Sequence, residues 1–179
     1  MKEYFLKMKG GAKSPPGVGF TELVWSWLGS VIGIAAVGYL SSIYFEPRDL
    51  TLIIGSFGAS AVLIYSAIKS PLAQPRNLIG GHIISGLVGV ACYRLFEGTI
   101  WIAAALAVSF AIMAMLITKT LHPPGGATAL IAVIGGDKIH SLGYLYAVIP
   151  AGAGAFILLI VALFVNNLSK DRRYPEYWF

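Results

Sequence analysis

The stretch LHPPGGATAL, residues 121–130, decides the fold of this chain because it interrupts a long apolar region. Its two prolines cannot continue a preceding helix, but proline is well suited to the first turn of a new one. The sequence therefore predicts a helix that begins near residue 124 and ends near residue 136. The eleven residues from 126 to 136 extend about 16 Å, roughly half of the hydrocarbon core of a bilayer. Residues 118–122 would approach this half-helix in an extended conformation, so the helix would start near the membrane midplane.

A second stretch, GASAVL at residues 58–63, aligns with GATALI at residues 126–131 at an offset of 68 residues. The same offset places Gly86 on Gly154. A short run rich in β-branched residues precedes the first copy, so a second half-helix is predicted from about 59 to 69, entering from the opposite side. Two such broken segments in the two halves of a membrane protein indicate a substrate site between inverted repeats. A transporter is therefore the leading interpretation.

The composition identifies a membrane protein. The 179 residues are 57% hydrophobic and 12% charged, with a mean hydropathy of +0.77, whereas soluble chains carry about 25% charged residues. Apolar runs of roughly 20 residues recur, which is the length needed to cross a bilayer. We expect an all-α polytopic protein with six membrane segments at residues 24–45, 50–69, 78–96, 100–118, 124–136 and 142–166.

Lysine and arginine residues are divided unevenly between the two predicted sides of the membrane. Ten lie on the side of both termini and three on the other side, so the positive-inside rule places both termini in the cytoplasm. This asymmetry supports an even number of crossings but does not distinguish six from four. Six is favoured because the 68-residue offset divides the chain into three-helix repeats at about 24–96 and 99–167. An odd number of spans per repeat inverts the second repeat relative to the first.

The repeats would form one transmembrane domain at residues 24–167. An interfacial segment at 1–23 and a cytoplasmic tail at 168–179 would flank it. Residues 1–13 resemble neither a secretory signal peptide nor a transit peptide. We therefore expect the protein in a bacterial inner membrane.

Two helix N-termini that point toward each other near the midplane would form a site for a small anion. Each presents unpaired backbone N–H groups and about half a positive charge, a combination that binds anions. The alternative is that the small residues of the two copies serve only close helix packing. Ser60 and Thr128 occupy equivalent positions, so their hydroxyls would add donors. The predicted binding residues are Ser56, Gly58, Ala59, Ser60, His122, Pro124, Gly125, Gly126, Ala127 and Thr128.

Three motifs resemble those of a known family. HPPGGAT at 122–128 resembles the signature of the HPP family of integral membrane proteins, and SPLAQPRN at 70–77 with IGGH at 79–82 resembles a second characteristic stretch. The resemblance covers about residues 25–166. Members of this family have been associated with nitrite transport in cyanobacteria and chloroplasts. The resemblance thus implies a small inorganic anion as substrate, with nitrite as the expected one.

Four further roles are open between function and structure. His122 would take part in gating or proton coupling, or would hold the extended approach by a hydrogen bond. His82 would contact the substrate, or would lie in water near the cytoplasmic end of its span. Arg76 would form an electrostatic entrance or anchor the chain at the cytoplasmic side. Lys119 would attract anions to a vestibule or snorkel to the interface.

Other functional classes agree less well with the sequence. It has no HExxH or GxSxG motif and no paired carboxylates in its spans, so we predict no enzyme, no metal site and no cofactor. The basic residues lie at membrane edges, which argues against nucleic acid as a partner. A channel for another small monovalent anion and a non-transporting assembly protein remain alternatives. Besides lipid, we expect a homo-oligomer packed through the glycines Gly29, Gly33, Gly38, Gly86 and Gly89.

Overall fold

The computed structural model describes residues 2–8, 12–46, 52 and 54–179, and every regular element in these ranges is helical. The all-α prediction is therefore confirmed. A π-helical segment at Ser41–Phe45 extends α2, another at Ala147–Gly152 precedes α8, and a 3₁₀ turn covers Pro71–Ala73. The α-helices are α1 (Lys2–Lys7), α2 (Phe20–Leu40), α3 (Ser56–Ser66), α4 (Pro75–Leu95), α5 (Ile100–Ile117), α6 (Pro123–Ile134), α7 (Asp137–Leu142) and α8 (Ala153–Leu168).

The helices fall into two length classes. α3 and α6 have 11 and 12 residues, and at about 16–18 Å they are too short to cross a bilayer alone. A short helix in each half of the chain agrees with the prediction, but the structure does not establish six crossings. Within the described residues, the segments long and apolar enough to cross a membrane are Phe20–Phe45, Pro75–Leu95, Ile100–Ile117 and Ala147–Leu168.

The short helices begin where small residues and prolines permit it. α6 begins at Pro123, as its two prolines predict. α3 begins at Ser56, three residues before the expected position, and it ends at Ser66 rather than at residue 69. The early end arises because Ala67 leaves the helical region, at φ −120° and ψ 46°, ahead of the proline-containing turn that follows.

The last membrane segment is not the single helix expected over 142–166. Pro150 has no N–H and disfavours helical backbone in the residue before it, and Ile149 is extended at φ −132° and ψ 118°. α8 therefore starts only after this kink. The residues between the fifth and sixth predicted segments form α7. Gly136 (φ 75°) and Gly143 (φ 52°) bound this helix with positive φ values that favour glycine.

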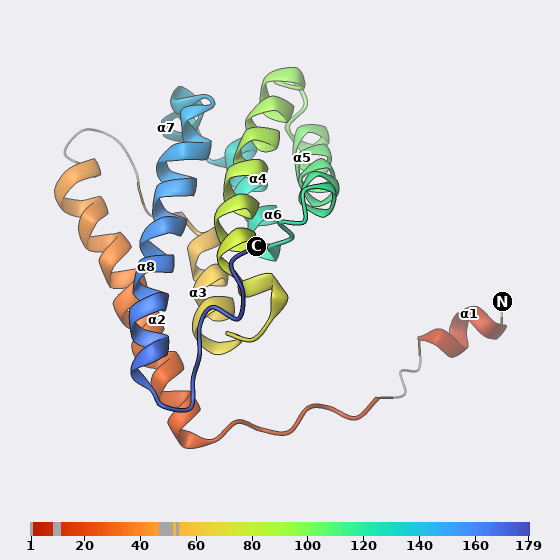
Figure 1. Ribbon diagram of the computed structural model, residues 1–179. Coiled ribbons are helices and arrows are strands. Elements are labelled where there is room, and N and C mark those ends of the chain that lie inside the picture. The colour runs from red at the N-terminus through yellow and green to blue at the C-terminus, as the bar shows by residue number, and fades with distance from the viewer. Residues whose placement is uncertain (1, 9–11, 47–51, 53) are drawn as a thin grey trace.

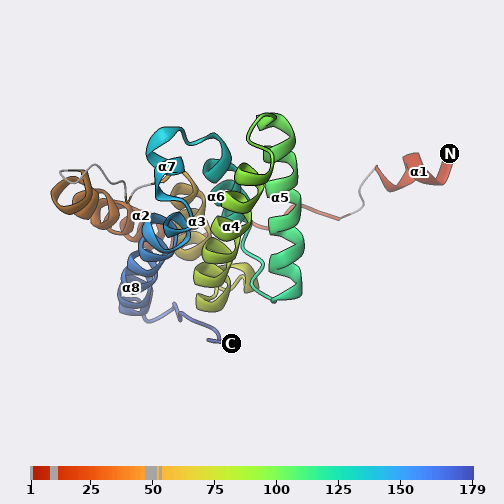
Figure 2. The same ribbon diagram turned by 90° about the horizontal axis from the view of Figure 1, so that it is seen from above.

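Helices α2 to α8 form a bundle, and α1 lies apart from it (Figure 1). α2 packs against α3 and α8, whereas α5 packs against α4 and α6. Seen from above, α3 and α6 lie between the side formed by α2 and α8 and the side formed by α4 and α5 (Figure 2). The starts of both short helices therefore lie between the longer ones, although Gly58, Ala59 and Pro123 are exposed.

Several glycines expected to pack against other subunits are used inside the chain. Gly29 and Gly33 of α2 face the ring of Tyr65 in α3, and a Cβ at Gly29 would lie 2.6 Å from Tyr65 Cδ1. On α4, a Cβ at Gly86 would lie 2.9 Å from Ala147 Cα. These contacts account for the glycines without a second copy, so they give no support to an oligomer.

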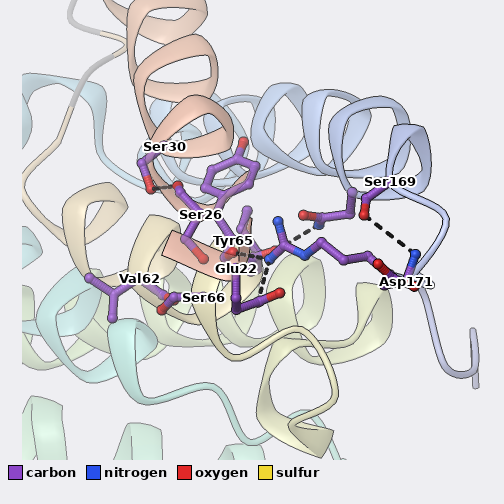
Figure 3. Close-up of polar contacts among 11 residues, drawn as sticks. Glu22, Ser26, Ser30, Val62, Tyr65, Ser66, Ser169 and Asp171 are labelled. Atoms are coloured by element: carbon purple, nitrogen blue, oxygen red, sulfur yellow. Dashed lines mark hydrogen bonds and ion pairs between the residues drawn. The ribbon is translucent and has the colours of Figure 1, made fainter. Parts of the chain in front are cut away.

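The start of α2 and the tail after α8 lie at the same end of the bundle, called here the terminal end. The Arg172 guanidinium lies 3.1 Å from Glu22 Oε1 and also donates to the Tyr65 carbonyl (Figure 3). Farther along the tail, the Tyr174 hydroxyl donates to the Ala73 carbonyl at 2.6 Å. The start of α2 and the segment after α8 thus lie at the same end of the bundle.

Candidate functional site

The N-terminal halves of α3 and α6 lie side by side and run in opposite directions. Ser56, the first residue of α3, has its Oγ 2.9 Å from Thr128 Oγ1, near the middle of α6. One turn later in α3, Ser60 Oγ lies 2.9 Å from Nε2 of His122, which precedes α6. Residue numbers rise along α3 while those of the partner residues fall from 128 to 122, so the two helices are antiparallel.

His82 of α4 contacts both short helices where they lie side by side. Its Nε2 lies 2.8 Å from Ser60 Oγ and its Nδ1 lies 2.7 Å from Thr128 Oγ1. Glycine permits this approach, because a Cβ at Gly81 would lie 2.5 Å from His122 Cβ. The two imidazole rings have their centroids 5.2 Å apart. Three helices thus bring two histidines to either side of one serine hydroxyl.

These groups form one continuous set of hydrogen bonds, called here the histidine chain. It begins at Ser56 Oγ and passes through Thr128, His82 and Ser60 to His122. It ends at the Leu72 carbonyl, 2.8 Å from His122 Nδ1. The two histidines, Ser60 and Thr128 are each 0% exposed. Because His82 is 0% exposed, it does not lie in water in this structure.

Backbone donors at the helix starts are mostly engaged already. The two prolines of α6 have no N–H, and the Gly125 N–H bonds to the His122 carbonyl at 2.8 Å. In α3, the Gly58 N–H lies 3.3 Å from the Gly55 carbonyl. The N–H groups of Ala59, Gly126 and Ala127 are placed to bond within their helices. The polar groups at the two helix starts that are not used in backbone hydrogen bonds are therefore side-chain hydroxyls and imidazoles.

The remaining predicted binding residues lie beside the histidine chain. Ala59, Ala127 and Pro124 line a shallow groove of about 360 Å³, together with Pro123 and two apolar residues of α3. A Cβ added to Gly58 would meet nothing within 4 Å, and one at Gly126 would have its nearest neighbour 3.8 Å away. Ala59, Pro124 and Ala127 therefore line an apolar groove in this conformation, while Gly58 and Gly126 lie next to open space.

The predicted entry residues lie at the terminal end of α4 and α5. The Arg76 guanidinium donates to the Thr118 carbonyl at 2.8 Å, and neighbouring Asn77 donates to the Leu121 carbonyl at 2.8 Å. Lys119 is exposed and adopts a positive φ of 58°. These contacts hold the extended approach to α6, and none of the described ones reaches the histidine chain.

From the sequence alone, the role of His82 was open and Leu72 was not identified as a site residue, although a signal for His82 was present. Buried residues Leu78, His82, Ser85 and Gly89 follow each other at helical spacing along α4. That spacing marks a face turned toward the interior. No comparable pattern identifies the Leu72 carbonyl, which depends on the 3₁₀ turn after α3.

Comparisons with known proteins agree with the membrane architecture. The family model described as HPP, transmembrane region, matches residues 15–175. Two curated transmembrane proteins of Dictyostelium discoideum are 46% and 45% identical to this chain over 99% of its length. The chain spans 58% and 64% of the lengths of these relatives. No solved structure matches it.

The relatives are described only as transmembrane proteins, and both come from a eukaryote. The bacterial inner membrane expected above therefore stays a prediction. The family match covers the four long helices, the two short helices and the histidine chain between them. This chain belongs to the HPP transmembrane-region family of membrane proteins.

Proposed function

We propose that this membrane protein transports a small monovalent anion, with nitrite as the first candidate substrate. The observation that carries the proposal is the set of five buried polar side chains where α3 and α6 lie side by side. Polar and ionisable residues at such positions are costly in an apolar bundle and usually mark a substrate path. A bundle that only fills the membrane requires neither short helices nor these groups.

The chemistry of the groups favours anions over cations. Hydroxyls and neutral imidazoles each offer one hydrogen-bond donor. The helices α3, α4, α5, α6 and α8 contain no Asp or Glu, so these helices supply no carboxylate for a cation. The association of family members with nitrite makes that anion the first to test.

We also propose that the chain consists of two inverted repeats, α2–α3–α4 and α5–α6–α8. Each has the order long, short, long. In these repeats α2 corresponds to α5, α3 to α6 and α4 to α8. The helix contacts have this symmetry, because α2 contacts α3 and α8 while α5 contacts α6 and α4. Local detail agrees as well: Ser60 Oγ and Thr128 Oγ1, 68 residues apart, each lie 3.3 Å from the carbonyl four residues earlier.

The buried state of the histidine chain favours a carrier over an open channel. Because its side chains are 0% exposed, an anion reaches them only if α3 and α6 separate. Inverted-repeat transporters move one bundle against the other around a central site. The substrate would then bind to the hydroxyls and imidazoles in an opened conformation.

Nitrite flux into proteoliposomes tests this function. We expect protein-dependent nitrite uptake that falls at least about tenfold in Thr128→Val and in Ser60→Ala, because each removes a donor from the site. Ser109→Ala is the matched control, since the Ser109 hydroxyl is exposed on α5 and bonds only to the Ala105 carbonyl among its described contacts. It should transport like the wild type.

Protein-free liposomes at the same pH correct for nitrous acid, which crosses lipid unaided. If purified protein gives no flux above this background for nitrite, nitrate or chloride, the transport proposal fails. That result would favour the alternative, a membrane assembly protein that does not transport. The full hydrogen bonding of the histidine chain is the observation that favours such a role.

The remaining expectations stand as parts of the proposal. Both termini would face the cytoplasm, because Lys69, Arg76, Lys119 and Arg172 gather at the terminal end. The protein would act without catalysis, metal or cofactor, and a homo-oligomer remains an expectation. Among the described residues, no three His, Cys, Asp or Glu side chains lie close enough together to hold a metal ion.

A further inference from the structure

The direction of each hydrogen bond in the histidine chain follows from counting protons. The Leu72 carbonyl can only accept, so His122 must donate through Nδ1. If His122 is neutral, its Nε2 has no proton and must accept from the Ser60 hydroxyl. Ser60 has then used its proton, so its oxygen must accept from Nε2 of His82. The donor and the acceptor of each of these three hydrogen bonds are therefore fixed when both histidines are neutral.

The remaining two links depend on the orientation of the Thr128 and Ser56 hydroxyls. A neutral His82 that donates through Nε2 has an unprotonated Nδ1, which must accept from the Thr128 hydroxyl. The five links then need five protons, and Ser56, Thr128, His82, Ser60 and His122 supply one each. The Thr128 Oγ1–Ser56 Oγ contact of 2.9 Å equally suits a Thr128 hydroxyl that donates to Ser56. One hydroxyl has one proton, so Thr128 can donate to Ser56 only if His82 Nδ1 carries a proton of its own.

Two proton arrangements therefore suit nearly the same positions of the heavy atoms. In the neutral one, Thr128 donates to His82 and the Ser56 hydroxyl turns to donate to Thr128. In the other, His82 carries a second proton on Nδ1 and donates it to Thr128, which donates to Ser56. The site can therefore gain or lose one proton with little movement of its heavy atoms.

The surroundings of the two histidines contain no built-in counterion. α3, α5, α6 and the 3₁₀ turn carry no charged residue, and the charged residues of α4 lie at its two ends. Arg76 bonds to the Thr118 carbonyl at one end, and Arg94 lies over the Tyr144 ring at the other. Lys119 is exposed, and the buried tyrosines of the neighbouring elements donate to carbonyls. Among the described contacts, no carboxylate faces the pair.

We propose that the histidine chain binds one proton together with one anion, so that the protein is an electroneutral proton–anion symporter. A buried imidazolium without a partner is strongly unfavourable, and a monovalent anion beside it removes the net charge. The bound anion thereby raises the affinity of the site for the proton, and the proton raises its affinity for the anion by the same factor, as thermodynamic linkage requires. This inference rests on the proposed anion transport and adds the co-substrate and the stoichiometry.

The first test measures protonation directly. The sequence has three histidines, so ¹⁵N-imidazole NMR of the full chain in lipid nanodiscs should give three assignable residues. We expect sodium nitrite, compared with sodium gluconate, to convert one histidine of the His82–His122 pair to imidazolium at a higher pH. His82→Gln keeps a polar group but cannot take up the proton, and it should abolish this response. His140→Gln should keep it, because His140 lies outside the histidine chain and stacks on Tyr93.

The second test separates this inference from the transport proposal. In proteoliposomes at a clamped membrane potential, the protein-dependent uptake should rise up to about tenfold per unit of external acidification and should not respond to the potential. Nitrate is a second probe because it stays ionised over this pH range. Anion flux that follows the potential and ignores pH would overturn the symport while leaving anion transport intact. Absence of all anion flux would overturn both, and a folded protein whose histidines ignore nitrite would overturn the proton site.

Discussion

At the scale of single residues, the hydroxyl of Thr128 has three partners in the site, as many as that of Ser60. It lies within hydrogen-bond distance of His82 Nδ1 and Ser56 Oγ, while its backbone carbonyl accepts from the Tyr146 hydroxyl at 3.0 Å. Because the residue is 0% exposed, water does not replace a partner that is lost. The side chain therefore contributes to stability as well as to the proposed transport.

Replacing this hydroxyl with a methyl group should destabilise the protein. Thr128→Val leaves His82 Nδ1 unpaired in a dry interior, which costs about 1–3 kcal/mol of unfolding free energy. Thr128→Ser keeps the hydroxyl and should lose less. Thermal and denaturant unfolding in detergent would measure both variants beside Ser109→Ala, which should stay within about 0.5 kcal/mol of the wild type. Equal stability of the valine and wild-type proteins would contradict the hydrogen bonds assigned to Thr128.

At the scale of helices, the spacing between α4 and α6 depends on glycine. A Cβ at Gly125 would lie 2.7 Å from Ser85 Oγ and 2.9 Å from the Gly81 carbonyl. Nothing lies within 4 Å of the corresponding position at Gly58 in α3. In the 68-residue repeat, Gly58 corresponds to Gly126, where an added Cβ would have its nearest neighbour 3.8 Å away. Close packing of α4 on α6 therefore depends on the preceding residue, Gly125.

Alanine substitutions at these glycines should have opposite effects. Gly125→Ala forces backbone and side chains apart and should cost about 1–3 kcal/mol, as overpacked cores do. Gly58→Ala adds a methyl group in open space within a helix and should stabilise by about 0.5–1 kcal/mol. Unfolding free energies of the two variants provide the comparison. If Gly125→Ala were neutral, the close approach of α4 and α6 would be wrong.

At the scale of the whole molecule, the C-terminal tail joins the start of α2 to the end of α3. The Arg172 side chain is only 2% exposed, and its described partners are Glu22 and the Tyr65 carbonyl. Burial lowers the pKa of Arg172, and Glu22 partly opposes that effect by raising it. Burial also raises the pKa of the Tyr174 phenol, which bonds to the Ala73 carbonyl. This hydrogen bond should be fully present below about pH 10 and be lost at higher pH.

Weakening the ion pair should release the tail without changing its protease sites. Glu22→Gln leaves a buried guanidinium without its counter-charge, so we expect tryptic cleavage in residues 170–173 to accelerate about fivefold to thirtyfold. That range corresponds to a loss of about 1–2 kcal/mol in docking. Glu97→Gln, an exposed carboxylate of the α4–α5 connection, is the control and should be cleaved at the wild-type rate. Unchanged cleavage of Glu22→Gln would mean that the tail is held by other contacts.

The sequence by itself determined the features that arise from local chemistry. The apolar content and run lengths identify a membrane protein, because about 20 apolar residues are needed to cross a bilayer. The two prolines of the HPP motif set the start of α6, because proline ends one helix and suits the first turn of the next. The distribution of basic residues predicts that both chain ends share one side of the membrane. The Arg172–Glu22 contact agrees with this for the start of α2 and the tail after α8.

Only the tertiary structure decided which groups face each other at the site. His82, Ser60 and His122 come from α4, α3 and the start of α6, so their contact depends on how three helices pack. Periodicity along the chain places a residue on a face but does not identify the partner across it. The Pro123–Pro124 pair also removed backbone donors that a generic helix start would offer, which transferred the polar chemistry to side chains. Packing, unlike local preference, joins residues distant in sequence, and it alone assembled the histidine chain.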